Sequence, residues 1–225
     1  LELSQYRYYD PETHGVDFSA MAEDLAAAGS DDIVLLHGCC HNPSGADLTP
    51  EQWREIASMA AKQGFTPMVD LAYQGFGEGL ETDVYGLRTL IEQVPEVVIA
   101  ASLSKNMGLY RERTGLAIFV GPDSRTAEAT VSQAKAAARR IYSMPPAHGA
   151  LLAGRVLGDP ILRADWEAEL TAMCARINGL RSEFQRRLEE ATGRDFGFIA
   201  KEKGMFSFLG LTEDQARSVR SERGL

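Results

Sequence analysis

The sequence has few cysteines, no long hydrophobic run and no excess of basic residues, and each deficit narrows the class of protein. Its three cysteines, Cys39, Cys40 and Cys174, are an odd number without a CxxC spacing, which disfavours a disulfide framework and favours a reducing, cytoplasmic location. No apolar run approaches the roughly 18 residues of a membrane span, and no charged-then-apolar leader opens the chain. The net charge of -9 argues against nucleic acid or an anionic membrane as a partner.

The remaining composition is that of a soluble globular enzyme. Of the 225 residues, 44% are hydrophobic and 24% are charged, which is enough to build a sizeable core. Short unbroken apolar runs predict strands over residues 33–36, 65–69, 97–101 and 116–120, and such runs are typical of parallel strands that are buried on both faces. Segments with helical periodicity separate them, at residues 18–28, 50–63, 84–93 and 126–140. The alternation predicts an α/β fold with a doubly wound, mostly parallel sheet.

The C-terminal third of the chain has a different pattern. Asp159 and Pro160 open the longest predicted helix, which is about 45 Å long if it continues to residue 190, and its apolar stripe from Trp166 to Leu188 is expected to be core. A small hairpin is predicted from residues 196–200 and 205–209, and a capping box at Thr212 starts a last helix. We expect two domains, a large one over residues 1–171 and part of a smaller α+β one over residues 172–225.

Polar residues follow three successive predicted strands. Asn42 follows the first strand, Asp70 and Tyr73 the second, and Lys105 the third. Ligands of doubly wound sheets bind beyond the carboxyl ends of the strands, so these side chains are predicted to share one site. Singly, each residue has a structural explanation, because Asp70 and Asn42 are ordinary turn residues and Tyr73 is an ordinary half-buried aromatic. Together, at three strand ends, they favour a functional site.

The segment around Lys105 has the groups needed to hold a phosphorylated aldehyde. The lysine amine can condense with the aldehyde, while the hydroxyls of Ser102 and Ser104 and the guanidinium of Arg113 can bind phosphate oxygens. A pyridine ring that serves as an electron sink needs a carboxylate against its nitrogen, which Asp70 can supply. A phenol and an amide, such as those of Tyr73 and Asn42, can hydrogen-bond an oxygen on that ring.

Four segments, taken together, resemble the class I, fold-type I aminotransferases, and the aspartate and aromatic amino-acid subgroup in particular. They are HGCCHNPSG from His37, VDLAYQGF from Val69, SLSKNMGLYRERTG from Ser102 and RRIYSMPP from Arg139. The match runs in the family's order over nearly the whole chain. The resemblance implies transamination between an L-amino acid, aromatic or aspartate, and a 2-oxo acid such as 2-oxoglutarate.

The resemblance also implies a cofactor and the residues that hold it. Pyridoxal 5'-phosphate would be bound covalently through Lys105, which would also shuttle a proton. Asp70 would pair with the pyridine nitrogen, and Asn42 and Tyr73 would contact the ring's 3-oxygen. The resemblance places the remaining cofactor-binding roles on residues that hold the phosphate or support Asp70 from behind: Ser102, Ser104, Arg113 and His37.

Substrate recognition is implied for Arg139 and Ser143, together with Asn42. Arg139 matches an arginine that reaches into the neighbouring subunit's site to bind a side-chain carboxylate, so a homodimer with shared active sites is expected. Met144 stands where aspartate-specific members often carry asparagine, which favours a substrate range that includes aromatic amino acids over a strict aspartate aminotransferase. The family's N-terminal arm, small-residue phosphate loop and carboxylate-binding arginine have no counterpart in the sequence, so we interpret the chain as a fragment lacking both ends.

Two alternatives remain open at this stage. A zinc site could in principle form from His37, Cys39, Cys40 and His41, but the turn formers that follow favour a strand end, and we predict no metal. A non-catalytic module with the same fold is the second alternative, and the missing ends are its only support. We assign no role to His14 or His148, and we expect the arginines of the last helix to form a solvated face.

Overall fold

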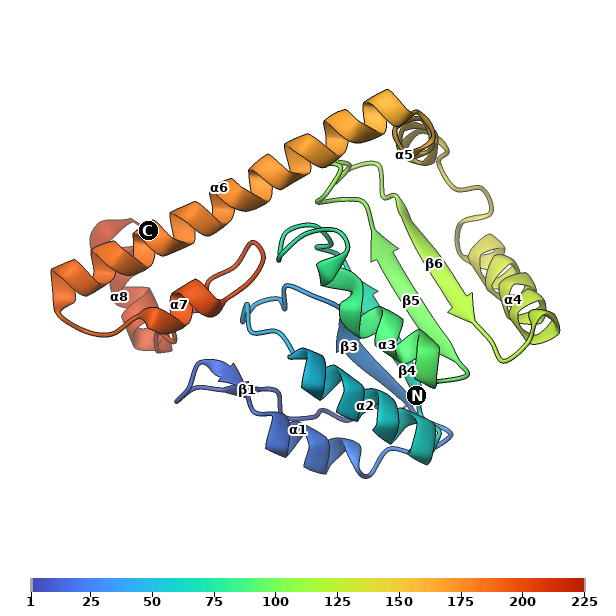
Figure 1. Cartoon of the computed structure of the whole chain (residues 1–225), viewed down its shortest axis with the longest axis horizontal. Coiled ribbons are helices and arrows are strands. Elements are labelled where there is room, and N and C mark those ends of the chain that lie inside the picture. Colours follow the sequence, from blue (N-terminus) through green and yellow to red (C-terminus); the bar gives the residue numbers. More distant parts are fainter. Residues whose placement is uncertain (1, 225) are drawn as a thin grey trace.

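The computed structural model describes residues 2–224, and a four-stranded sheet is its central element (Figure 1). The strands are β3 (Ile33–His37), β4 (Thr66–Leu71), β5 (Val97–Ser102) and β6 (Gly115–Val120). They are ordered β3-β4-β5-β6; the first three are parallel, and β6 runs antiparallel to β5. The predicted α/β class and mostly parallel sheet are confirmed.

Three helices cover one face of the sheet and build the core. They are α1 (Phe18–Leu25), α2 (Pro50–Gln63) and α3 (Tyr85–Gln93), and η1 (Thr82–Val84) leads into α3. The predicted local signals of α2 are confirmed, because Thr49 and Gln52 form a reciprocal capping box and Gly64 closes the helix with a left-handed φ of 87°. Beneath these helices, Ile56, Phe65 and Ile99 are almost completely buried.

The opposite face of the sheet is open, and the expectation of strands buried on both faces is wrong for this chain. In β3 only alternate residues are buried, and Ile33 and Leu35 are 66% and 49% exposed. Leu116 and Ile118 of β6 are also exposed, because no helix of the described chain extends over that edge strand. An unbroken apolar run was therefore a reliable sign of a strand but an unreliable sign of two-sided burial.

One long helix crosses the molecule to the C-terminal elements. It is α6 (Pro160–Thr192), whose 33 residues form one continuous helix, about 50 Å long at 1.5 Å per residue. The expected core stripe is only partly buried, since Leu170 is buried whereas Leu180 and Phe184 are 57% and 40% exposed. The remaining helices are α4 (Ser124–Tyr142), α5 (His148–Gly158), α7 (Gly197–Lys201) and α8 (Glu213–Arg223).

The predicted hairpin of residues 196–209 is wrong. The first half forms the short helix α7. The backbone groups of the second half form hydrogen bonds with side chains and not with a second strand. The buried guanidinium of Arg181 donates to the carbonyls of Gly204 and Phe206, and Glu202 accepts from the Phe208 amide at 2.9 Å. Because these side chains satisfy the backbone groups, the segment needs no partner strand.

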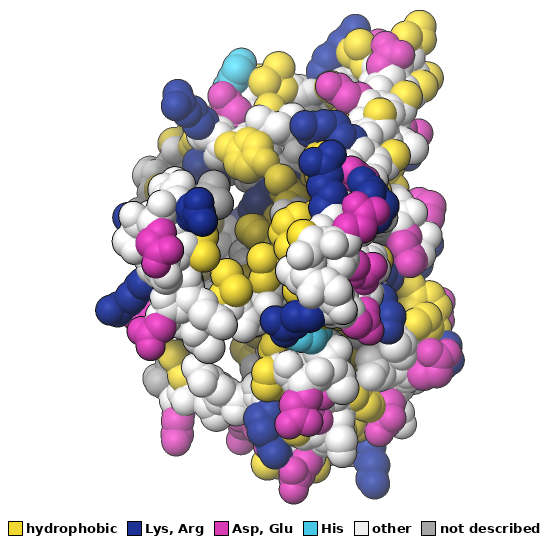
Figure 2. Space-filling model, turned by 90° about the vertical axis from the view of Figure 1, so that its left-hand side faces the viewer, with side chains coloured by type: hydrophobic (Ala, Val, Ile, Leu, Met, Phe, Trp, Pro, Cys, Tyr) yellow, Lys and Arg dark blue, Asp and Glu magenta, His cyan; other side chains and the backbone are white. Residues whose placement is uncertain are grey.

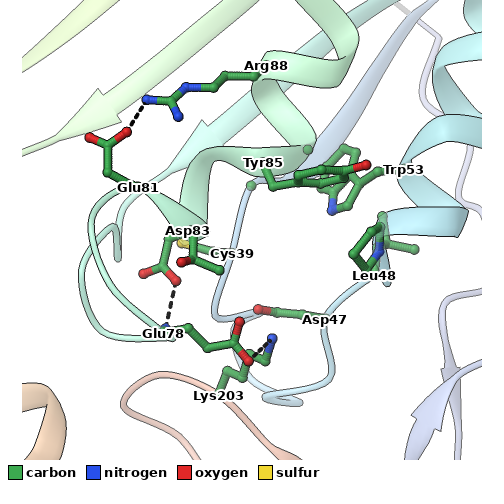
Figure 3. A pocket seen from close by; sticks show the side chains of 14 residues that line it. Cys39, Asp47, Leu48, Trp53, Glu78, Glu81, Asp83, Tyr85, Arg88 and Lys203 are labelled. Atoms are coloured by element: carbon green, nitrogen blue, oxygen red, sulfur yellow. Dashed lines mark hydrogen bonds and ion pairs between the residues drawn. The ribbon is translucent and has the colours of Figure 1, made fainter.

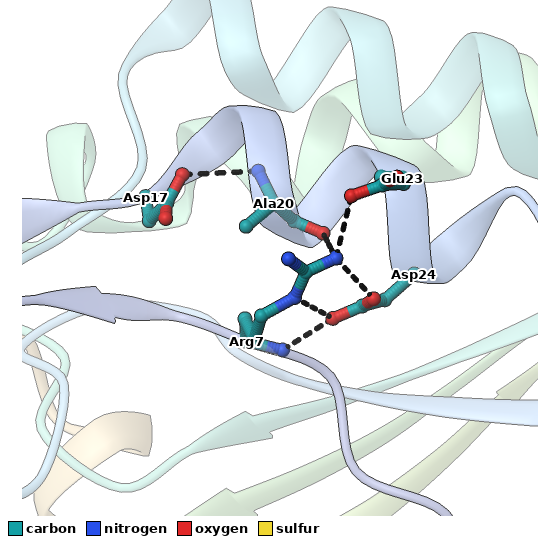
Figure 4. A network of polar contacts seen from close by, with 5 residues as sticks. All are labelled: Arg7, Asp17, Ala20, Glu23 and Asp24. Carbon is teal, nitrogen blue, oxygen red and sulfur yellow. Dashed lines mark hydrogen bonds and ion pairs between the residues drawn. The ribbon is translucent and has the colours of Figure 1, made fainter.

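The N-terminal segment is attached to α1 and to the C-terminal elements. Arg7 forms ion pairs with Glu23 and Asp24 at 2.7 and 2.6 Å, and its hydrogen bonds lower the pKa of Asp24 to about 2 (Figure 4). Further along, the short strands β1 (Tyr9–Asp10) and β2 (Gly15–Val16) pair antiparallel. The His14 ring, between them, stacks on Phe198 at 3.7 Å. Residues 6–16 therefore link the sheet domain to the C-terminal part.

No helix within residues 2–224 combines the length and the apolar character that crossing a membrane requires.

Candidate functional site

The carboxyl ends of β3, β4 and β5 bring the predicted site residues to one edge of the sheet. His37 and Asp70 are register partners on adjacent parallel strands, and Asp70 is in turn the partner of Ala100 on β5. Asp70 lies on the open face, on the same side as Met68, because side chains alternate along a strand. The loops that follow the three strands therefore start side by side, as the sequence predicts.

Tyr73 is the meeting point of two other predicted residues. The Asn42 side-chain amide donates to the Tyr73 hydroxyl at 3.4 Å, and the Lys105 Nζ lies 4.9 Å from the centroid of the Tyr73 ring. Tyr73 is buried, and this burial raises its pKa, against the lowering effect of the Asn42 hydrogen bond and with a smaller raising effect from Asp70. The structure thus joins an amine, an amide and a phenol that are 31 to 63 residues apart in sequence.

The Lys105 loop is held in place from both sides. Ser104 is buried, and its backbone amide donates to the Ser102 hydroxyl at 3.1 Å. Asn106, the residue after the lysine, donates its side-chain amide to the Gln74 carbonyl and accepts from the Trp166 indole at its backbone carbonyl, 2.7 Å away. The Asn106 side-chain oxygen is buried without a hydrogen-bond partner in the described chain.

Arg113 lies on the loop between β5 and β6 and has an unusual backbone conformation. Its φ of 52° is left-handed, and its guanidinium donates to the Tyr110 carbonyl at 3.0 Å. Within residues 2–224 it makes no hydrogen bond to Ser102 or Ser104. Its neighbour Glu112 pairs with His148 at 2.9 Å, so His148, which the sequence left without a role, attaches α5 to this loop.

A stack of three aromatic rings supports the β3 strand end. The His41 ring lies 4.1 Å from the Tyr8 ring and 4.3 Å from the His37 ring. Burial, together with the neighbouring His37, lowers the pKa of His41 to about 4, so His41 is neutral at neutral pH. The His37 Nδ1 accepts a hydrogen bond from the backbone amide of Asn42 at 3.4 Å. Sequence reasoning missed Tyr8 and His41, because nothing local marks a contact between residues 33 positions apart.

Two of the three predicted substrate-binding residues, Arg139 and Ser143, lie apart from this group, whereas the third, Asn42, is part of it. Both are exposed at the C-terminal end of α4, beyond β6, and Ser143 has a left-handed φ of 61°. Within the described part of the chain neither one contacts the residues around Tyr73. Their predicted role concerns the site of a second subunit and stays a prediction.

A segment that sequence reasoning missed closes the site from the C-terminal side. The Lys203 amide donates to the Gly45 carbonyl at 2.8 Å, and the Phe206 ring meets the Tyr73 ring edge-on at 5.9 Å. Arg181, only 6% exposed, fixes this segment from α6. An arginine within the apolar stripe of a helix was the signal available in the sequence.

Figure 2 views the molecule from the side of the C-terminal helices and shows hydrophobic side chains gathered around a hollow.

Comparison with known proteins gives one consistent family. The family model described as "Aminotransferase class I and II" matches residues 1–223. The aromatic-amino-acid aminotransferase of Paracoccus denitrificans is 50% identical over 226 residues, and the aspartate aminotransferase of Escherichia coli (strain K12) is 48% identical. Each alignment covers 100% of this chain but 57% of the relative, so the chain spans little more than half of their length.

Solved structures agree with the sequence relatives. An aromatic amino acid aminotransferase with 3-indolebutyric acid superposes with a TM-score of 0.97 at 51% identity, covering 100% of this chain and 57% of the other. The aromatic-amino-acid aminotransferase from Burkholderia pseudomallei, covalently bound to pyridoxal phosphate, also gives 0.97, at 40% identity and with 56% of that chain covered.

Proposed function

Because the chain belongs to the class I and II aminotransferases, we propose that the protein transfers an amino group between an L-amino acid and a 2-oxo acid with pyridoxal 5'-phosphate as cofactor. The observation that carries the proposal is the convergence of Lys105 and Asn42 on Tyr73, beside the strand end that bears Asp70. The relatives and the solved structure that contains pyridoxal phosphate support it.

The residues present fit this cofactor by their chemistry. The strand ends supply an amine, a carboxylate, a phenol and an amide, and Ser102 and Ser104 add two hydroxyls. The buried side-chain oxygen of Asn106, next to Lys105, has no partner in the described chain and is a free acceptor beside the proposed site. When bound, the cofactor supplies an electron sink that stabilises negative charge on the substrate's alpha carbon.

Each residue then has a role that follows from its position. Lys105 would hold the cofactor through its amine, and the same amine would move a proton at the substrate's alpha carbon. Asp70 holds a proton on the ring nitrogen by its negative charge. Tyr73 and Asn42, already hydrogen-bonded to each other, orient the ring by donating to its oxygen. Ser102, Ser104 and Arg113 bind the phosphate, and His37 supports Asp70 from the neighbouring strand.

The whole active site needs more than one chain. Arg139 and Ser143 are exposed on α4, and we propose that they contact the substrate in a second subunit of a homodimer in the cytoplasm. The boundary between the large domain (residues 1–171) and the small one (residues 172–225) then lies within α6. Since the similar relatives include aromatic-amino-acid and aspartate aminotransferases, we propose that both substrate classes are accepted.

Activity assays on the full-length protein test these roles. With 2-oxoglutarate as acceptor, transamination of aspartate and phenylalanine is measured for the parent, for Arg139→Ala and for the matched control Arg140→Ala. We expect Arg139→Ala to lose about 100-fold in kcat/KM with aspartate and little with phenylalanine, since an ionic contact is removed for one substrate only. Equal losses with both substrates contradict the role of Arg139, and inactivity of the parent contradicts the proposed function itself.

A further inference from the structure

Two cysteines and an aspartate form a buried cluster outside the proposed cofactor site. The Sγ atoms of Cys39 and Cys40 and a carboxylate oxygen of Asp83 all lie within 4.8 Å of one another. Cys39, Cys40 and Asp83 are 6%, 0% and 8% exposed, and both cysteines are free thiols. The two cysteines follow β3, whereas Asp83 comes from η1, so the fold brings together groups that are more than forty positions apart.

The backbone around the cysteines explains why two adjacent thiols point the same way. In an extended segment neighbouring side chains point to opposite sides, but Cys40 has a left-handed φ of 53°, which breaks this alternation. The amides of Cys40 and His41 both donate to the Asp47 carboxylate, at 2.7 and 2.9 Å, and fix the turn. Gly204 packs so closely on Cys40 that a Cβ there would lie 2.3 Å from the cysteine Cβ.

Asp83 is held as a rigid ligand with one acceptor position free. Its Oδ2 accepts from the amides of Gly75 and Gly77, at 2.7 and 3.0 Å, and its Oδ1 accepts only from the amide of Glu78, at 2.8 Å. A carboxylate has about four lone-pair positions, so three hydrogen bonds leave one on Oδ1. Hydrogen bonds that orient a ligand in this way are typical of the surroundings of protein metal ions.

A cavity gives the cluster a route to solvent (Figure 3). Cys39 and Asp83 both line this cavity of about 400 Å³, together with Trp53 and Tyr85. Its two cations are already paired, Arg88 with Glu81 and Lys203 with Glu78. Asp47 and Asp83 have no cationic partner within 4 Å among the described residues, so the cavity favours a positively charged occupant.

We propose that Cys39, Cys40 and Asp83 bind a soft divalent cation such as Zn²⁺, through two sulfurs and one oxygen, with a water molecule from the cavity as fourth ligand. Zinc takes thiolate and carboxylate ligands in tetrahedral sites, and sulfur excludes hard cations such as Mg²⁺. The proposal departs from the prediction of no metal, and it differs from the set of His37, Cys39, Cys40 and His41 weighed as an alternative, because the two histidine rings lie 4.3 Å apart, tilted by 39°. No redox change occurs, because the ion replaces the two thiol protons, which leave to solvent.

Coordination has a proton signature. A thiol binds zinc as the thiolate, so coordination by both cysteines displaces two protons per ion. This release distinguishes coordination by both thiols from adsorption of an ion on the acidic surface.

Titration of the full-length reduced protein with Zn²⁺, against a chromophoric chelator, tests the site. We expect one ion per chain and two protons released in weakly buffered solution. Replacing Zn²⁺ by Co²⁺ should give the charge-transfer absorption of cobalt bound to thiolates. Binding without proton release, or a cobalt spectrum without the thiolate band, overturns the proposal.

Variants separate the three ligands from the rest of the chain. Cys39→Ser, on the cavity wall, should weaken Zn²⁺ binding by at least about 100-fold, and Asp83→Asn by about 10-fold because a neutral oxygen remains. Cys174→Ser is the matched control, since Cys174 is a buried free thiol outside the cluster of Cys39, Cys40 and Asp83. This variant should bind Zn²⁺ as the parent does. Circular dichroism verifies that each variant is folded. If Cys39→Ser binds Zn²⁺ as tightly as the parent, or if Cys174→Ser loses as much affinity as Cys39→Ser, the proposed metal site is wrong. This outcome is independent of the transamination activity.

Discussion

The strands β3, β4 and β5 and the region of β6 and α4 use similar sequence patterns but reach different degrees of burial. All but one of the buried residues of the main core cluster come from residues 21–99. In contrast, α4 has no buried residue, and no residue of β6 is buried either. An apolar run therefore specifies a strand locally, whereas the burial of that strand depends on the helices that pack against it. The relatives are nearly twice as long as this chain, and we expect the exposed apolar faces to be covered in the proposed dimer.

The largest expected effect belongs to the site at the well-packed strand ends. Lys105→Ala should lower transamination by about 1,000-fold or more, because in the proposed mechanism the removed amine both holds the cofactor and transfers a proton. Lys135→Ala, which removes an exposed lysine of α4, is the matched control and should leave the activity unchanged. Steady-state kinetics of the full-length protein measure both. If Lys105→Ala keeps a tenth of the parent activity, the assignment of Lys105 is wrong.

A pair of isoleucines tests the difference in packing. Ile56→Ala should reduce the free energy of unfolding by about 2–5 kcal/mol, because Ile56 is fully buried and its removal leaves a cavity. Ile141→Ala, at a position 78% exposed on α4, should change it by less than about 0.5 kcal/mol. Urea denaturation followed by circular dichroism gives both values. A large loss for Ile141→Ala would show that α4 is covered in the assembled protein, and comparison at several protein concentrations would identify a dimer contact.

The pH dependence of stability tests the stack of Tyr8, His41 and His37. The pKa of His41 is lowered to about 4 in the folded protein, whereas an unfolded histidine titrates near 6.5. The unfolded state thus binds more protons between these values, so this contribution is fully present above about pH 6.5 and is lost as the pH falls towards 4.

We expect the parent to lose on the order of 1 kcal/mol more stability than His41→Asn between pH 7 and pH 5. Denaturant unfolding at the two pH values measures the difference. The mutation sits in the same strand-end region as the proposed cofactor site, and Asn is chosen because it keeps a polar side chain next to Ser44. Equal losses in parent and variant would mean that His41 titrates normally.

The smallest expected effects come from the two capping boxes. Thr49→Ala removes the cap of α2, which packs on the core, and should lower the free energy of unfolding by about 1 kcal/mol. Thr212→Ala removes the same motif from α8, none of whose residues is buried. We expect it to reduce helix content slightly without shifting the main unfolding transition. An equal shift from both variants would mean that α8 unfolds together with the core.

The sequence was sufficient where the determinants are local. The capping box at Thr49, the stop at Gly64 and the start of α6 at Asp159 and Pro160 depend on residues a few positions apart, and all three were predicted correctly. The arrangement of Asp70 and Lys105 at strand ends also followed from a general rule of parallel sheets. Their roles, like the domain boundary, stay predictions.

Sequence reasoning failed where a distant side chain competed with a local pattern. The apolar, aromatic-rich sequence of residues 205–209 is typical of a strand, but Arg181 binds the carbonyls of Gly204 and Phe206, which a partner strand would otherwise use. Helix α5 was missed because its small residues, such as Ala150 and Gly154, carry a weak periodic signal. The contacts of Phe206 with Tyr73 and of Lys203 with Gly45 span more than 130 residues, and no short-range pattern encodes them.

Because α6 is one continuous helix, it connects the lysine loop rigidly to the C-terminal segment that contains Phe206. Its beginning is anchored beside the lysine loop through Trp166, and its far half carries Arg181, which grips the segment bearing Phe206. From Trp166 to Arg181 the helix rises about 22 Å, so a tilt of about 5° at Trp166 displaces Arg181 by about 2 Å. A small rotation at the start of the helix therefore moves Arg181 and the Phe206 segment bound to it. Such a movement decides whether the Phe206 ring contacts the Tyr73 ring.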